Sequence, residues 1–153
     1  GIEENASTKM WRKYFSKAKI YGFEYDNIKI IKAKKHKLKN TFYKKIDVTS
    51  QQSIQGAFSK LNKKFEIIID DSTHIFDHQI NIIKNVYPYL KKNGILIIED
   101  IYKYRREYSE INYYKKLKNL KNIFEKIYFV EFYNINNFTA SWKNEKLLIL
   151  IRK

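Results

Sequence analysis

Acidic side chains and one histidine follow two apolar runs of the sequence, and together they could form a cation site beside a proton acceptor. They are Asp70, Asp71, His74, Glu99 and Asp100. The apolar runs are FEIII at 65–69 and ILII at 95–98. Carboxylates offer hard oxygen ligands, which favour Mg²⁺, Mn²⁺ or Ca²⁺ over soft metals. Because histidine can accept a proton near neutral pH, His74 is a candidate general base.

The two apolar runs are predicted to be neighbouring parallel strands. Short apolar runs without alternation are typical of strands buried on both faces, and a strand, helix, strand order favours a right-handed parallel crossover. Strands of this kind lie about 4.8 Å apart, and functional groups gather at their carboxyl ends. Acids placed there would repel one another, and a divalent cation would relieve the repulsion. We therefore expect Asp71, Glu99 and Asp100 to hold a divalent cation.

Two other interpretations of these residues stay open. Acids that follow strands also cap helix N-termini or pair with lysine and arginine. In addition, His78 lies one helical turn after His74, a spacing that weakly indicates a zinc site when both side chains share a helix face. For His78 we prefer a structural role, in which it orients the loop or packs against the sheet.

Composition limits the class of protein. The chain has 153 residues, which fits a single domain over 1–153. It has no cysteine, which excludes disulfides and thiolate chemistry. No apolar run approaches the length of a membrane span and no signal peptide opens the chain, so we expect a soluble, cytoplasmic protein.

The formal charge of +15 has two explanations. A dense cationic surface attracts nucleic acid through counterion release. Alternatively, the joint excess of lysine, asparagine, isoleucine and tyrosine indicates codon choice in an A+T-rich genome. The lysines are scattered apart from a cluster at 32–39, so we favour the second explanation and keep a nucleic-acid partner as the alternative.

The N-terminal part has the order of a nucleotide-binding unit. A polar loop precedes a predicted helix at 8–18, for which Ser7 or Thr8 is a natural N-cap. A loop that leads into a helix N-terminus can hold an anionic or carboxylate-bearing ligand through its backbone N–H groups. A predicted strand at 19–25 then places Glu24 where a carboxylate can accept both hydroxyls of a ribose.

The other predicted elements extend this order. They are a short helix or irregular basic segment at 26–38, a strand at 41–46 followed by Asp47, which could contact a nucleobase, a helix at 51–61, a loop of aromatic and cationic residues at 102–108, a helix at 109–126 and an antiparallel hairpin of strands at 128–133 and 147–151. The helix at 109–126 has an apolar stripe of Ile111, Tyr114, Leu117, Leu120 and Phe124.

Several stretches resemble class I S-adenosylmethionine-dependent methyltransferases. They are GIEENASTKMWRKYF, KIYGFEYD, IIIDDSTHIFDHQI, YPYLKKNGILIIED and FTASWKNEKLLILIRK. In particular, the chain resembles the metal-dependent O-methyltransferases similar to macrocin and macrolide-sugar O-methyltransferases and cephalosporin hydroxylase-like proteins. The pairing of DDSTH with a downstream IIED is the most specific part of this resemblance.

The resemblance implies an α/β fold, a Rossmann-like sheet that is mostly parallel and ends in an antiparallel hairpin. It also implies cofactor-binding residues, namely Gly1 and Ser7 in the loop around the methionine moiety, Glu24 at the ribose, Asp47 beside the adenine and Asp70 at the amino-acid end. It further implies a divalent cation on Asp71, Glu99 and Asp100, with His74 as the general base.

The sequence departs from this family in two respects. The loop at 1–7 has one glycine where the family usually has two or three, and the first strand of the family's sheet should precede Gly1. The absence of that strand would leave two buried strand edges unpaired. We therefore expect either an upstream segment or a strand from another chain, and an unpaired edge would favour a homo-oligomer.

The function that we expect is Mg²⁺-assisted methylation of a hydroxyl on a sugar or small natural product, with S-adenosylmethionine as the donor. One alternative is a nucleic-acid methyltransferase, although the sequence has no Asn/Asp-Pro-Pro-aromatic motif that would hold a flipped base. The other alternative is a non-catalytic binding protein with the same fold.

Overall fold

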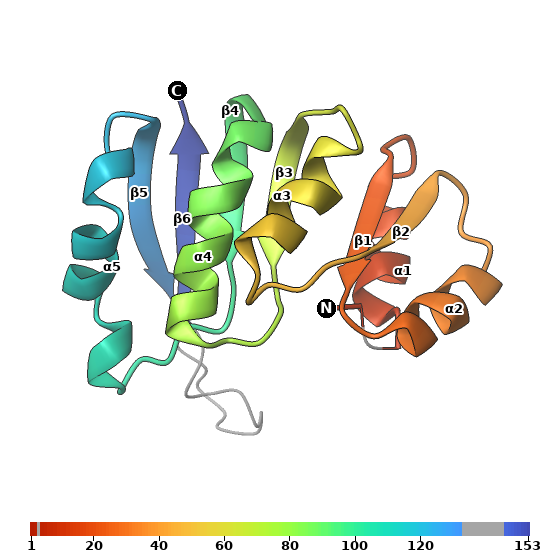
Figure 1. Cartoon of the computed structure of the whole chain (residues 1–153), viewed down its shortest axis with the longest axis horizontal. Helices are drawn as coiled ribbons and strands as arrows, with labels where there is room; N and C mark the ends of the chain where they lie inside the picture. Colours follow the sequence, from red (N-terminus) through yellow and green to blue (C-terminus); the bar gives the residue numbers. More distant parts are fainter. Residues whose placement is uncertain (3, 133–145) are drawn as a thin grey trace. The chain divides into compact units, whose positions relative to one another are not determined.

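The computed structural model describes residues 1–2, 4–132 and 146–153, which divide into two compact units, Gly1–Lys60 and Leu61–Lys153 (Figure 1). The first unit contains α1 (Ala6–Tyr14), β1 (Ile20–Glu24), α2 (Asn27–Lys35), β2 (Thr41–Lys45) and α3 (Gln51–Ser59). The second contains β3 (Phe65–Asp70), α4 (Phe76–Val86), β4 (Leu90–Ile98), α5 (Glu110–Lys116), β5 (Phe124–Glu131) and β6 (Lys146–Arg152), with 3-10 turns η1 (Tyr87–Tyr89), η2 (Arg106–Tyr108) and η3 (Lys118–Leu120).

In the first unit, β1 and β2 form a parallel pair in which Ile20 is opposite Thr41. The chain crosses between them through α2, whose N-cap Asp26 accepts a hydrogen bond from the backbone N–H of Ile28 at 2.7 Å. Gly22 is needed on β1, because a Cβ there would lie 2.9 Å from the ring of Tyr43. The two strands predicted at 19–25 and 41–46 are confirmed as this parallel pair.

The second unit is built on a four-stranded sheet in the order β3-β4-β6-β5. The β3–β4 pair is parallel, and β6 is antiparallel to both of its neighbours. In Figure 1, α4 runs across one face of this sheet. The alternate residues Leu96, Ile98, Leu148 and Leu150 are completely buried on β4 and β6. The α/β fold with parallel strands and a C-terminal antiparallel hairpin, predicted from the sequence, is confirmed.

The helix predicted at 109–126 is wrong in its length and in part of its apolar face, since Leu117 and Phe124 are buried as expected but Ile111 is not. The helix α5 ends at Lys116, and Phe124 already belongs to β5. Within α5, Ile111 is 77% exposed, whereas Tyr113, which was not on the predicted stripe, is fully buried. The apolar residues of this stretch fit a helical period in more than one way. The packing of Tyr113 into the core of the second unit determines which face of α5 is buried.

The first helix also differs from its prediction. It begins at Ala6 after the N-cap residue Asn5, so neither Ser7 nor Thr8 is the N-cap. It ends at Tyr14 rather than at residue 18. Beyond this end, the guanidinium of Arg12 donates hydrogen bonds to carbonyl oxygens, among them that of Ala18 at 2.6 Å.

The division into two units leaves the single domain at 1–153 a prediction. Over the residues that the structure describes, none of the helices combines the length and apolarity that crossing a bilayer requires. Nearly all of the predicted hairpin turn and the first half of the resembling stretch FTASWKNEKLLILIRK fall at 133–145, which lies outside the described residues.

Candidate functional site

Side chains at the ends of β3 and β4 meet at one edge of the sheet in the second unit. Asp70 is the register partner of Ile98, so the residues after each strand emerge together. Asp71, His74 and Asp100 each offer a ligand atom within 4.8 Å of the others. The imidazole lies between the two carboxylates, with Nε2 at 3.9 Å from Asp71 Oδ1 and Nδ1 at 3.6 Å from Asp100 Oδ2. We call these three residues the cation cluster.

The cation cluster fits a divalent cation. Its two carboxylates supply the hard oxygen ligands that Mg²⁺ and Mn²⁺ prefer. The Nδ1 atom of His74 is buried, and it has no hydrogen-bond partner within the described part of the chain. Its distance of 3.6 Å to Asp100 is too long for a hydrogen bond. Because a buried polar atom without a partner is costly, a proton donor or a ligand at this point would stabilise the cluster.

Two members of the cluster have an unusual backbone. His74 has φ 58° and Asp100 has φ 54°, both in the left-handed region. This conformation costs a non-glycine residue about 1–2 kcal/mol, and such residues occur disproportionately at functional sites. Backbone hydrogen bonds on both sides of Asp100 hold its left-handed conformation. The N–H of Glu99 donates to the carbonyl of Asp70 at 2.9 Å, and the N–H of Ile101 donates to the carbonyl of Lys146 at 3.0 Å.

Negative charge is crowded at this edge of the sheet. Burial raises the pKa of Asp70 to about 6. Burial and, after it, the charges of Asp71 and Asp100 raise the pKa of Glu99 to about 7. Burial also raises the pKa of Asp100. The raised values mean that ionising all of these carboxyls at neutral pH costs free energy, which a bound cation would recover.

The roles of Asp71, Glu99 and Asp100 as cation ligands stay predictions, and the three acids are not placed alike. Asp71 and Asp100 lie in the cation cluster, whereas Glu99 is not part of that group of ligand atoms. The backbone of Glu99 is held from α4, because Gln79 Nε2 donates to its carbonyl at 3.1 Å. Gln79 is buried and accepts a hydrogen bond from Tyr113. These hydrogen bonds could not be predicted from the sequence, since they join residues far apart in the chain.

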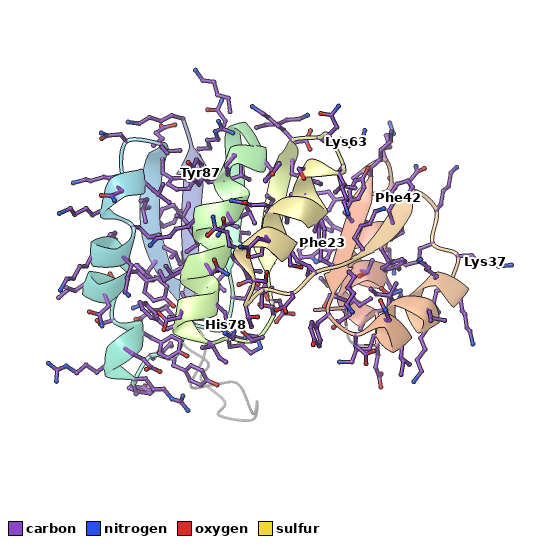
Figure 2. All side chains as sticks on the ribbon, viewed as in Figure 1. Phe23, Lys37, Phe42, Lys63, His78 and Tyr87 are labelled. Carbon is purple, nitrogen blue, oxygen red and sulfur yellow. The ribbon has the colours of Figure 1, made fainter. Side chains whose placement is uncertain are left out.

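His78 has the structural role preferred from the sequence. It lies at the N-terminal end of α4 (Figure 2), and its Nδ1 is 2.8 Å from Thr73 Oγ1 in the preceding loop. It is not part of the cation cluster, so the spacing of His74 and His78 does not build a zinc site with these acids.

In the first unit, Glu24 is a buried acceptor for three backbone N–H groups. Its Oε2 accepts from Ile2 at 2.9 Å, and its Oε1 accepts from Tyr25 at 2.8 Å and Asp26 at 3.1 Å. Burial alone would raise the pKa of Glu24, but these hydrogen bonds outweigh it and leave the pKa below its ordinary value. A carboxylate has about four lone-pair sites, so Glu24 retains the capacity for about one further donor, such as one ribose hydroxyl.

The other cofactor-binding residues expected from the sequence are local turn and helix residues. A Cβ on Gly1 would come within 2.9 Å of Glu24 Oε2, so glycine allows the chain to approach that carboxylate. Ser7 lies in the first turn of α1. Asp47 Oδ1 accepts hydrogen bonds from the backbone N–H of Thr49 at 2.9 Å and from its hydroxyl at 2.6 Å. Their contacts to a cofactor stay predictions.

Asn5 is a residue that the sequence reasoning missed. It has φ 66°, it is 1% exposed, and its Nδ2 donates to the hydroxyl of Tyr43 at 2.7 Å. Its Oδ1 is buried without a hydrogen-bond partner in the described residues. An asparagine just before a predicted helix was the available signal, because asparagine tolerates the left-handed conformation and favours the N-cap position.

Replacing Glu24 with glutamine is expected to lower the free energy of unfolding by about 1–3 kcal/mol, because a charged acceptor is lost and the amide NH₂ faces backbone donors. Urea unfolding at neutral pH measures this. Exposed Glu125, replaced in the same way, is the matched control and should change the free energy by less than about 0.5 kcal/mol. Equal effects of the two substitutions would contradict the buried acceptor role of Glu24.

The family described as methyltransferase domain matches residues 5–148. The 8-demethyl-8-(2-methoxy-alpha-L-rhamnosyl)-tetracenomycin-C 3'-O-methyltransferase of Streptomyces olivaceus is 28% identical over 103 residues, which are 65% of this chain and 24% of that protein. Demethylmacrocin O-methyltransferase of Streptomyces fradiae is 27% identical over 99 residues, which are 63% of this chain and 23% of that protein.

Solved structures share the fold. The MycE methyltransferase from the mycinamycin biosynthetic pathway, in complex with Mg, SAH and Mycinamycin VI, has a TM-score of 0.68 at 15% identity. The match covers 95% of this chain and 39% of MycE. The chain therefore spans about a quarter of the length of the two curated relatives and less than half of MycE.

Proposed function

We propose, from the premise that the chain belongs to the methyltransferase domain family, that it is part of an S-adenosylmethionine-dependent O-methyltransferase. The observation that supports this most strongly is the cation cluster, which places a candidate base between two carboxylates at the end of β3 and β4. The curated relatives support the reaction, since their names describe O-methyltransferases.

We propose a sugar or small natural product as the methyl acceptor. The names of the relatives refer to a rhamnosyl tetracenomycin and to macrocin, and the MycE complex contains Mycinamycin VI. The same complex contains Mg, which supports Mg²⁺ as the cation for this chain. Hard carboxylate oxygens in the cluster agree with that choice.

In the proposed reaction, S-adenosylmethionine supplies an activated methyl group on sulfur, and the cation supplies positive charge that lowers the pKa of a nearby hydroxyl. Asp71 and Asp100 would hold the cation, with Glu99 as the expected third acid. His74 would take the hydroxyl proton at Nε2, the nitrogen on the side of Asp71. Asp100, at 3.6 Å from Nδ1, would stabilise the imidazolium that forms.

Each unit, considered by itself, holds residues that we propose as contacts of the donor. In the first unit, the remaining capacity of Glu24 suits a ribose hydroxyl, and the unpartnered Oδ1 of Asn5 suits a donor group of the cofactor. Asp47 is the proposed neighbour of the adenine. In the second unit, Asp70 is proposed at the amino-acid end, where burial and its raised pKa allow it to accept or donate a hydrogen bond.

Calorimetric titration with S-adenosylmethionine, with and without Mg²⁺, tests this function. We expect binding of the cofactor, and methyl transfer to a glycosylated acceptor only when the cation is present. Failure of the cofactor to bind, in protein that includes any residues encoded before Gly1, would favour the non-catalytic alternative. Strongly salt-dependent binding of RNA or DNA would favour a nucleic-acid methyltransferase.

Replacing Asp71 with asparagine is expected to weaken Mn²⁺ binding at least about 10-fold, because it removes a charged ligand and leaves an amide of the same shape. Competition between Mn²⁺ and Mg²⁺, followed by electron paramagnetic resonance, measures this affinity. Asp77, in the first turn of α4 and outside the cation cluster, is the matched control for the same substitution. An unchanged affinity in Asp71→Asn would refute the ligand role.

A further inference from the structure

One tyrosine hydroxyl makes hydrogen bonds to the backbone of both His74 and Phe76. Tyr108 lies in η2, 34 residues further along the chain, and its hydroxyl donates to the backbone carbonyl of His74 at 2.8 Å. The same oxygen accepts a hydrogen bond from the backbone N–H of Phe76 at 3.2 Å. These bonds fix the main chain immediately before and after Ile75, which is the N-cap residue of α4.

We propose that Tyr108 is a positioning residue, whose hydroxyl holds His74 in its left-handed backbone conformation and thereby directs the imidazole between Asp71 and Asp100. The inference rests on the proposed function for the use of the cation cluster. It adds a residue from the loop between β4 and α5 that does not itself touch the cluster's ligand atoms.

The hydroxyl of Tyr108 pairs with two backbone groups, the N–H of Phe76 and the carbonyl of His74. Phe76 is the first residue of α4, where a backbone N–H has no carbonyl acceptor within the helix. Ile75 offers no side-chain cap, so Tyr108 is the acceptor that the structure gives to Phe76 N–H. On the other side, His74 adopts φ 58° although it is not glycine. A conformation of that kind persists only where the surroundings impose it.

The ring of Tyr108 is itself firmly placed. It is 4% exposed, and it packs edge to face against Phe76 and Tyr102, with ring centroids 5.9 and 5.1 Å away. The hydroxyl therefore reaches His74 and Phe76 from a fixed direction. Removal of this one oxygen leaves the ring packing intact but takes away the hydrogen bond to the carbonyl of His74. The left-handed backbone conformation of His74 then loses this support.

The test compares Tyr108→Phe with Tyr102→Phe. Tyr102 lies in the same loop and packs edge to face against Tyr108, but its hydroxyl makes no hydrogen bond in the part of the chain described here, so its loss is the matched control. In cation-free protein, the imidazole resonances of His74 are measured by ¹⁵N NMR, and backbone hydrogen exchange is measured at Phe76. The affinity for Mn²⁺ is measured afterwards on the same samples.

We expect Tyr108→Phe to shift and broaden the His74 resonances and to speed exchange at Phe76. Buried Leu96 on β4 should exchange as in the wild type, which separates this effect from general loss of stability. Tyr102→Phe should change none of these quantities. Unchanged His74 resonances in Tyr108→Phe would overturn the inference.

The wild-type protein provides a second test that needs no variant. An amide at the first position of a helix exchanges rapidly unless something outside the helix accepts its proton. Slow exchange at Phe76 is expected, and rapid exchange would overturn the inference. Absence of Mn²⁺ binding by the wild type would instead count against the proposed function, while the NMR and exchange results would still decide the role of Tyr108.

Discussion

Replacement of His74 with alanine is expected to reduce methyl transfer by about 10²–10⁴-fold while leaving the affinity for S-adenosylmethionine nearly unchanged. This range is the usual contribution of a positioned general base. His74 is the one imidazole within the cation cluster, and both of its nitrogens lie within 4.0 Å of a carboxylate. Single-turnover rates with saturating cofactor and acceptor measure the chemical step, and calorimetry measures cofactor affinity.

His36→Ala is the matched control, because His36 is exposed at the end of α2 and lies far from β3 and β4 in the sequence. It should retain the wild-type rate. The affinity for Mn²⁺ then separates two roles for His74. Loss of turnover with intact Mn²⁺ binding indicates a base, whereas loss of both would indicate that His74 is a ligand of the cation. A rate within about twofold of the wild type would contradict either role.

Raising the pH from 5 to 8 without divalent cations is expected to lower the free energy of unfolding by about 2–3 kcal/mol through Asp70 and Glu99. Burial raises the pKa of Asp70 from 3.8 to about 6, and burial with neighbouring charge raises that of Glu99 from 4.5 to about 7. Between these limits the unfolded chain has released protons that the folded protein still holds. Stability is therefore greatest below pH 4 for these two groups and falls as pH rises through 7. Glu99 is partly solvated, so its share is reduced by screening.

Urea unfolding in the presence of EDTA measures this slope, and the double variant Asp70→Asn with Glu99→Gln provides the reference because its amides do not titrate. The wild type should lose about 2–3 kcal/mol more than the double variant between pH 5 and 8. Saturating Mg²⁺ should remove most of the difference, since the cation favours the ionised carboxylates. If the free energy of unfolding changed with pH equally in the two proteins, Asp70 and Glu99 would not have the raised pKa values that burial gives them.

The strands were predictable from the sequence because their signal is local. Apolar runs such as 65–69 favour a strand, and the interval between runs favours a helical crossover. The burial on both faces that was expected for this run is wrong, because β3 is at the edge of its sheet and Ile67 is 42% exposed. The edge at which Asp71 and Asp100 meet followed from the same reasoning, since parallel strands end on one side. The helices were predicted less accurately. The local pattern at 109–126 suited a long helix, and only packing selected Tyr113 for burial and began β5 at Phe124.

The sequence by itself therefore determined the order of the elements, the α/β fold and the edge of the sheet where acids and an imidazole gather. Tertiary structure decided which side chains approach one another there. It placed His74 between Asp71 and Asp100, kept the ligand atoms of Glu99 outside that group, and brought Tyr108 to the backbone of His74. The physical reason is range: strand and turn preferences act over a few residues, whereas the contacts of His74 with Asp100 and Tyr108 join positions about 30 residues apart and depend on dihedral angles that spacing does not encode.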